Sequence, residues 1–322
     1  MTNVRYLYAL PLFFLLSACA MRAEPTSEPR TEGFVTTGDG IRLYYVEQGY
    51  GPDTLVAPAA LYLEPLLLDA LAAHRRVVLY DVRNRGRSDA ADLGNVSLER
   101  QIKDLEELRI SLGIDRMQLL GWSTYGMEMA VYAMRYPDRV SRLVQVSPLA
   151  PAAEIMEYHE DKRAEKMDRA AIVSLEERFE AGEFDDSPER YCRQLSELTI
   201  PASFVNADFA ALVPDDCDYP NEWSINRSAY FRAFFATLGD FDWRDDLQKL
   251  AVPRLIIHGR EDGIPLAGAE AWAAGYDNAR LLVVSPAGHF PFVEQKQAVI
   301  AAIETFLAGD WPDNATGGGA PR

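Results

Sequence analysis

Three features of the sequence predict an α/β fold with a mostly parallel central sheet, flanking helices and an inserted helical lid. Short apolar runs alternate with stretches of helical periodicity from residue 33 onward. The alternation stops near residue 150, where a stretch rich in Glu and Asp begins, and it returns near residue 249. The 322 residues are 48% hydrophobic, which is enough to bury one sizeable core.

The expected elements follow one another along the chain. Apolar runs predict strands at residues 41–49, 54–58, 75–81, 117–121, 142–148, 253–259 and 279–285. Residues 97–114 have apolar side chains at helical spacing after Ser97, a plausible N-cap. Further helices are expected up to Arg135 and over 295–307. Within the insertion, Ser187 followed by proline indicates the start of another helix.

The N-terminal segment has the form of an export signal. Arg5 precedes an apolar run that is too short to span a bilayer, and small residues follow it. The phrase LSAC, ending at Cys19, resembles the lipobox of bacterial lipoproteins, which implies cleavage before Cys19 and a lipid anchor on its thiol. We therefore expect an exported, membrane-anchored lipoprotein facing the periplasm of a bacterium; an ordinary secreted protein is the alternative.

The chain thus divides into a predicted signal peptide, a polar tether, two halves of one core separated by the lid, and a disordered tail. Their boundaries are 1–18, 19–32, 33–149 with 249–308, 150–248, and 309–322. The other two cysteines, Cys192 and Cys217, form either a disulfide or two buried thiols. A disulfide would contribute roughly 3 kcal/mol in the chain-entropy model.

Charge and motif content exclude several classes of partner. The net charge of -17 would repel a phosphate backbone, so nucleic acid is not an expected partner. No Rossmann or P-loop glycine pattern is present, and no Cys/His cluster has metal-binding spacing. The sequence therefore implies neither a cofactor nor a metal.

The stretch MQLLGWSTYGMEMA places Ser123 where a strand turns sharply into a helix. Such a turn exposes a serine hydroxyl and directs helix N–H groups at the same point. The nucleophile motif G-x-S-x-G fits from Gly121 onward, but Tyr125 occupies the final glycine position and Gly126 follows it. Taken alone, the match is weak, because an ordinary strand-to-helix turn would look similar.

A histidine and an acid occupy the loops where partners for Ser123 are needed. Of the four histidines, His289 alone follows a strand in a loop rich in turn residues, which suits a general base. Asp262 follows the preceding strand, with Glu261 as an adjacent alternative. The chain order Ser, Asp, His is the order of a known triad arrangement.

The sequence resembles that of the α/β-hydrolase superfamily over about residues 33–308. The matching phrases are DVRNRGRSD, DLEELRISLGI, LLGWS, MRYPDRVSRLVQVSP, LIIHGRED and AGHFPFVEQ. The resemblance implies an α/β-hydrolase fold with Ser123 as nucleophile, Asp262 as orienting acid and His289 as general base. In DVRNRGRSD, charged side chains that are buried need partners, so we expect structural roles for Asp81, Arg83 and Arg85.

Two departures from the family pattern affect the site. Pro58 and Ala59 replace the usual His-Gly, and proline has no N–H to donate. We expect Thr124 and Ala60 to supply the two oxyanion-hole donors, with Leu61 as the alternative to Ala60. The other departure is the bulky Tyr125, which either lines the pocket or only fills a gap.

The expected function is a serine hydrolase that cleaves an ester or amide through a covalent acyl-enzyme. Trp122, Tyr125 and Glu222 are the candidate substrate-binding residues. In a narrower version, the chain resembles an exported proline iminopeptidase that holds the free amine of a short peptide with lid carboxylates such as Glu222. The alternative from another class is a catalytically silent binding protein on the same fold.

Overall fold

A computed structural model describes residues 30–157, 163–274 and 276–317. The predicted signal peptide and Cys19 lie outside the described residues. The strands are β1 (Thr31–Thr36), β2 (Arg42–Gln48), β3 (Thr54–Pro58), β4 (Arg76–Tyr80), β5 (Met117–Trp122), β6 (Val140–Val146), β7 (Arg254–Gly259), β8 (Ala279–Val284) and β9 (Thr316–Gly317). They form one sheet in the order β1-β2-β4-β3-β5-β6-β7-β8-β9.

The sheet is parallel from β4 through β8, as the alternating sequence pattern predicted. The antiparallel pairs lie at its margins, where β1 joins β2, β2 joins β4, and β9 joins β8. β1 begins with the last two residues of the expected tether and was not expected as a strand, and β9 falls in the expected disordered tail. Trp311 in that tail packs against Phe306, with ring centroids 5.0 Å apart, so residues up to 317 belong to the core.

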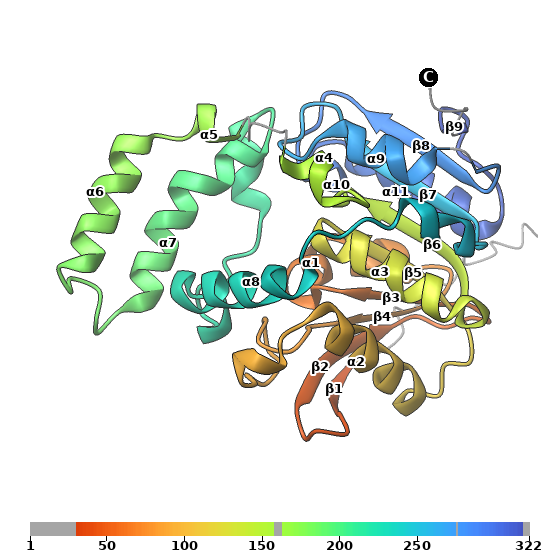
Figure 1. Cartoon of the computed structure of the whole chain (residues 1–322), viewed down its shortest axis with the longest axis horizontal. Coiled ribbons are helices and arrows are strands. Elements are labelled where there is room, and N and C mark those ends of the chain that lie inside the picture. Colours follow the sequence, from red (N-terminus) through yellow and green to blue (C-terminus); the bar gives the residue numbers. More distant parts are fainter. Residues whose placement is uncertain (1–29, 158–162, 275, 318–322) are drawn as a thin grey trace, which may run out of the picture.

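Helices cover both faces of this sheet (Figure 1). One set is α1 (Ala60–Leu71) and α11 (Lys296–Ala308), which pack against each other. Another is α2 (Leu98–Ser111) and α3 (Thr124–Arg135), and α9 (Leu266–Ala273) packs on β7 and β8. The cap of α2 forms as expected, because Ser97 Oγ accepts a hydrogen bond from the Arg100 N–H at 3.1 Å.

The insertion between β6 and β7 is helical and stands beside the sheet as a separate lobe (Figure 1). Its helices are α4 (Ala153–Glu157), α5 (Arg163–Lys166), α6 (Arg169–Glu180), α7 (Pro188–Thr199) and α8 (Ser224–Leu238). Leu175, Phe184 and Tyr191 give this lobe a small core of its own. Over the described ranges, no helix combines the length and apolarity needed to cross a bilayer.

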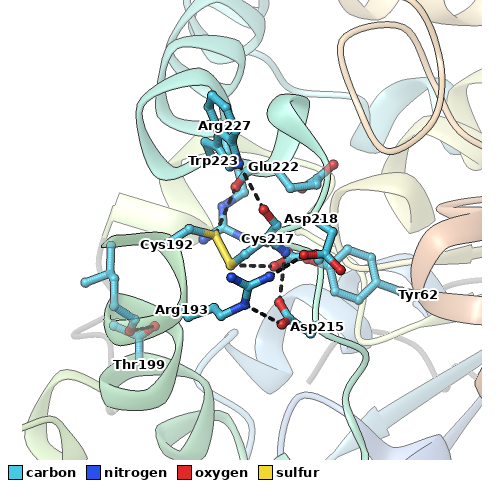
Figure 2. Close-up of a disulfide and its surroundings, with 12 residues drawn as sticks. Tyr62, Cys192, Arg193, Thr199, Asp215, Cys217, Asp218, Glu222, Trp223 and Arg227 are labelled. Atoms are coloured by element: carbon cyan, nitrogen blue, oxygen red, sulfur yellow. Dashed lines mark hydrogen bonds and ion pairs between the residues drawn. A yellow bond between two sulfur atoms is a disulfide. The ribbon is translucent and has the colours of Figure 1, made fainter. Parts of the chain in front are cut away.

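A disulfide joins Cys192 on α7 to Cys217, with the two Cα atoms 5.7 Å apart (Figure 2). The lid also contacts the core close to the C-terminal end of β8. The His289 N–H donates to the Ser203 carbonyl at 2.9 Å, and Phe204 stacks on Phe290 with ring centroids 4.9 Å apart. The lid is therefore tied to the loop that carries the expected general base.

Candidate active site

Ser123 sits on a strained corner between β5 and α3. Its backbone has φ 59° and ψ −129°, a region that L-residues rarely adopt. Neighbouring strands and turns hold it there: the Ser123 N–H donates to the Val146 carbonyl at 2.9 Å, and the Ser123 carbonyl accepts from Gly126 N–H, also at 2.9 Å. Such strain persists only where the surroundings enforce it, and it raises the hydroxyl clear of the sheet.

Two glycines, Gly121 and Gly126, provide the close packing at this corner, so the residue at position 125 need not be a glycine. A Cβ on Gly121 would overlap the backbone of Tyr125, and one on Gly126 would lie 2.8 Å from Pro148 Cβ. Gly126 therefore makes the close approach of α3 to the loop after β6. The side chain of Tyr125 instead lines the cavity that contains Ser123.

His289 lies between Ser123 and Asp262 and is within hydrogen-bonding distance of both. His289 Nε2 is 3.1 Å from Ser123 Oγ, and His289 Nδ1 is 3.0 Å from Asp262 Oδ2. Asp262 and His289 are only 5% and 7% exposed. The alternative acid, Glu261, is occupied elsewhere, because it accepts from Ser285 Oγ and Ala287 N–H.

Asp262 is held in its ionised form. Burial works to raise its pKa, but the attraction and hydrogen bonding of His289 outweigh it and bring the pKa to about 2. The Ile264 N–H also donates to Asp262 Oδ1 at 2.9 Å. A second histidine, His258, lies behind the carboxylate, with Nε2 at 4.0 Å from Oδ2, and burial lowers its pKa. Asp262 is thus a fixed negative charge facing the His289 ring.

The loop after β3 turns into α1 through a residue in a strained conformation. Ala59 has φ 68° and ψ 47°, the left-handed region that normally favours glycine. Leu61 gives its N–H to Asp81 Oδ1 at 2.9 Å, which leaves Ala60 as the better second donor. Ala60 and Thr124 are the first residues of α1 and α3, so neither N–H has an intrahelical acceptor. Thr124 lines the cavity around Ser123, whereas Ala60 is fully buried and is not among the lining residues, so its part as a donor stays a prediction.

A cavity of about 230 Å³ opens over Ser123 and His289, between the core and the lid. Trp122 and Tyr125 both line it, as expected of substrate-binding candidates. Trp122 is itself fixed, because its Nε1 donates to the His289 carbonyl at 2.9 Å. The other described lining residues are Tyr62, Arg85, Thr124, Arg163, Ile200, Ser203, Arg227, Phe231 and Phe290.

Glu222 does not line this cavity, contrary to expectation. Its side chain is 1% exposed and receives two hydrogen bonds from Arg85, from Nε at 2.9 Å and from Nη2 at 2.7 Å. The Gly86 N–H donates to the same carboxylate at 2.7 Å. Burial would raise the pKa of Glu222, but the charge and hydrogen bonds of Arg85 hold it below its usual value. With its oxygens so occupied, Glu222 is placed to orient Arg85 and not to hold a substrate amine.

Arg85, Arg227 and Tyr62 also line the cavity, and none of them was expected there. We expected a structural role for the whole phrase DVRNRGRSD. That role fits Arg83, which is fully buried and paired with Asp104 at 2.6 Å. It also fits Arg85, which is 7% exposed and paired with Glu222. Arg85 lines the cavity as well, a second position that apolar periodicity does not report.

One group in the described part of the chain has the geometry of a metal site, namely Cys192, Asp216 and Cys217. Its two sulfur atoms are joined to each other, so they offer no thiolate ligand.

Comparison with known proteins agrees with this architecture. The family model for the alpha/beta hydrolase fold matches residues 55–296. A proline iminopeptidase of Heyndrickxia coagulans is 24% identical over 86% of this chain and 98% of its own. A pimeloyl-[acyl-carrier protein] methyl ester esterase of Aeromonas hydrophila is 27% identical over 75% of this chain and 88% of its own.

Solved structures show the same fold. A hydrolase from Pseudomonas aeruginosa PA01 superimposes with a TM-score of 0.62 at 24% identity, over 86% of this chain and 98% of that one. The matched family model spans β3 through the start of α11 and includes Ser123, Asp262 and His289. The chain belongs to the α/β-hydrolase fold family.

Proposed function

We propose that the protein is a serine hydrolase that cleaves an ester through a covalent acyl-enzyme. The observation that carries the proposal is the chain of hydrogen bonds from Ser123 Oγ through His289 to Asp262. A serine hydroxyl at so strained a corner, next to a buried imidazole and carboxylate, has little structural purpose.

In the first half of the reaction, Ser123 Oγ attacks the ester carbonyl carbon while His289 Nε2 takes the hydroxyl proton. The ionised Asp262 keeps the Nδ1–H of His289 directed at itself, so that Nε2 presents its lone pair to serine. The developing oxyanion is stabilised by the N–H groups of Thr124 and Ala60. The tetrahedral intermediate then collapses: the C–O bond to the alcohol breaks, and His289 returns its proton to the leaving oxygen.

Water completes the cycle by attacking the Ser123 ester. His289 now accepts a proton from water, the second tetrahedral intermediate breaks its bond to Ser123 Oγ, and the carboxylic acid leaves. Each proton taken is returned, so the enzyme regains its starting state without a cofactor.

Ester hydrolysis is favoured over the iminopeptidase-like activity by the lining of the cavity. The lid carboxylate that we expected to hold a free amine, Glu222, is committed to Arg85. Arg85 and Arg227 line the cavity, and the described lining residues include no carboxylate that could pair with an ammonium ion. Of the relatives above, one is named an iminopeptidase and one a methyl ester esterase, so sequence similarity alone does not decide between them.

We also propose that the protein is exported and anchored by a lipid on Cys19, facing the periplasm of a bacterium. The form of residues 1–18 supports this. The disulfide between Cys192 and Cys217 is what an oxidising compartment permits. Replacing Cys19 by Ala should release the protein from the membrane fraction of cells that express the full chain. Retention of that variant in membranes would argue against the anchor.

The activity is tested on the protein lacking its first nineteen residues, with a panel of acyl esters and aminoacyl amides whose amines are free or blocked. We expect ester turnover that falls by about 10⁵-fold in Ser123→Ala. Turnover confined to amides with a free amine would instead establish the aminopeptidase. A folded protein that turns over no substrate in the panel would support the silent binding protein.

A further inference from the structure

Two arginines from distant parts of the chain line the same cavity as the reacting groups. Arg85 comes from the core loop after β4, and Arg227 comes from α8 of the lid. Both are therefore close to any substrate whose carbonyl lies between Ser123 and His289. Neither is needed for the proton transfers described above.

The guanidinium of Arg85 is fixed by its surroundings. It forms the fork with Glu222 through Nε and Nη2, and Nη1 takes no part in that fork. Its Cζ lies 5.0 Å from the ring centroid of Phe231 and 5.3 Å from that of Tyr230. Such a planar cation, oriented in advance and 7% exposed, loses little freedom on binding a partner.

Arg227 is held in a similar way by a second lid carboxylate. Its Nη1 donates to Asp216 Oδ2 at 3.0 Å, and Tyr62 Oη donates to the same oxygen. Figure 2 shows Asp216's neighbour Cys217 bonded to Cys192, with Arg227, Glu222 and Tyr62 around the disulfide. The segment from Asp216 to Glu222 thus positions both arginines, and the disulfide ties it to α7.

The polarity of the cavity follows from this arrangement. Glu222 pairs with Arg85 but does not itself line the cavity. Among the described residues of the lining, three are arginines and none is acidic. Tyr125 adds a phenol that is neutral at physiological pH, because burial raises its pKa. A carboxylate entering the cavity meets oriented N–H donors, whereas an ammonium finds no carboxylate among the described lining residues.

We propose that Arg85 and Arg227 form an anion subsite that binds a carboxylate group of the substrate while its ester lies at Ser123. The substrate class is an ester that carries a second, free carboxylate, such as a monoester of a dicarboxylic acid. This inference rests on the proposed function for its ester, but the subsite itself is a binding property.

The test compares three series of methyl esters of matched, graded chain length, ending in a carboxylate, a carboxamide or an ammonium group. We expect kcat/KM for the best carboxylate ester to exceed that of its carboxamide counterpart by about 10- to 100-fold, the range of one charge-assisted contact. The ammonium ester should be the poorest. Equal rates for carboxylate and carboxamide esters would overturn the subsite while leaving the hydrolase intact.

Variants then assign the preference to the arginines. Arg227→Gln should lower the ratio of kcat/KM on the carboxylate ester to kcat/KM on the carboxamide ester by about 10-fold. Arg227→Lys, which keeps the charge, should restore part of the preference. The matched control is Arg178→Gln, an exposed lid arginine outside this cavity that pairs with Glu183, and it should leave the ratio unchanged. Because the ratio is measured within one protein, partial unfolding of a variant does not alter it.

A binding measurement keeps the two proposals separable. Titration calorimetry of Ser123→Ala with the free dicarboxylate, and with the diol of the same length, requires no turnover. Binding of the dicarboxylate that weakens at least about 10-fold in Ser123→Ala/Arg227→Gln supports the subsite even if no ester is hydrolysed. Equal affinity for diacid and diol would overturn it.

Discussion

The substitution Glu222→Gln tests whether the Glu222 carboxylate stabilises the fold or binds the substrate. The substitution keeps the shape of the side chain and its bond from Gly86, but it removes the charge opposite Arg85. Both side chains are below 10% exposed, so the guanidinium is left buried without its counter-ion. Breaking a buried ion pair costs about 3–5 kcal/mol, and the surviving hydrogen bond places the expected loss near the lower value, at about 3 kcal/mol.

Urea unfolding of the variant and wild type measures this loss. The expected effect also depends on pH in a known direction. The pKa of Glu222 is lowered in the folded protein, so its stabilisation is complete above its usual value of 4.5 and is lost as pH falls through the folded value. Wild type and variant should therefore converge in stability as the pH is lowered from neutrality into that acidic range.

The control is Glu197→Gln, which removes the same charge from an exposed position on α7 and should change stability by less than about 0.5 kcal/mol. If Glu222→Gln lowered the free energy of unfolding by no more than this control does, the ion pair with Arg85 would contribute nothing to stability. If it instead abolished turnover of substrates with a free amine, Glu222 would be the amine-binding residue that we first expected.

Three further outcomes follow from the structure. Cys192→Ser/Cys217→Ser should lower the free energy of unfolding by about 3 kcal/mol, given the sequence separation of 25, and an unchanged urea midpoint would argue against the crosslink. Gly126→Ala should unfold at a lower temperature than wild type, because its Cβ would lie 2.8 Å from Pro148; an equal or higher melting temperature would show that the loop yields. Asp262→Asn should lose about 2 kcal/mol of stability at neutral pH, and this difference should disappear as pH falls from about 4 to about 2, as urea titrations across that range would show.

The central sheet was predictable because each parallel strand is buried on both faces and appears as an apolar run. The proximity of Ser123, Asp262 and His289 followed from the same reasoning, since they lie beyond the ends of β5, β7 and β8. Parallel strands bring such loops to one edge of a sheet. β1 and β9 were missed because they lie at the margins of the sheet and are largely exposed, so their sequences resemble a polar linker.

The surroundings of the triad were less accessible to sequence reasoning. Arg85 and Glu222 are far apart in the chain, and each belongs to a local pattern that suggests a different role. Only the folding of the lid against the core brings them together, and with them the place of Arg227 beside the cavity. Charge composition reports how many carboxylates the lid contains, but not which of them are turned inward and paired.

The most direct test of the reaction is to treat the folded protein with a fluorophosphonate and identify the modified residue by peptide mass spectrometry. We expect one adduct per chain, on Ser123, which is lost in Ser123→Ala and formed far more slowly in His289→Gln. A folded protein that remains unmodified, or an adduct on any other residue, would contradict it.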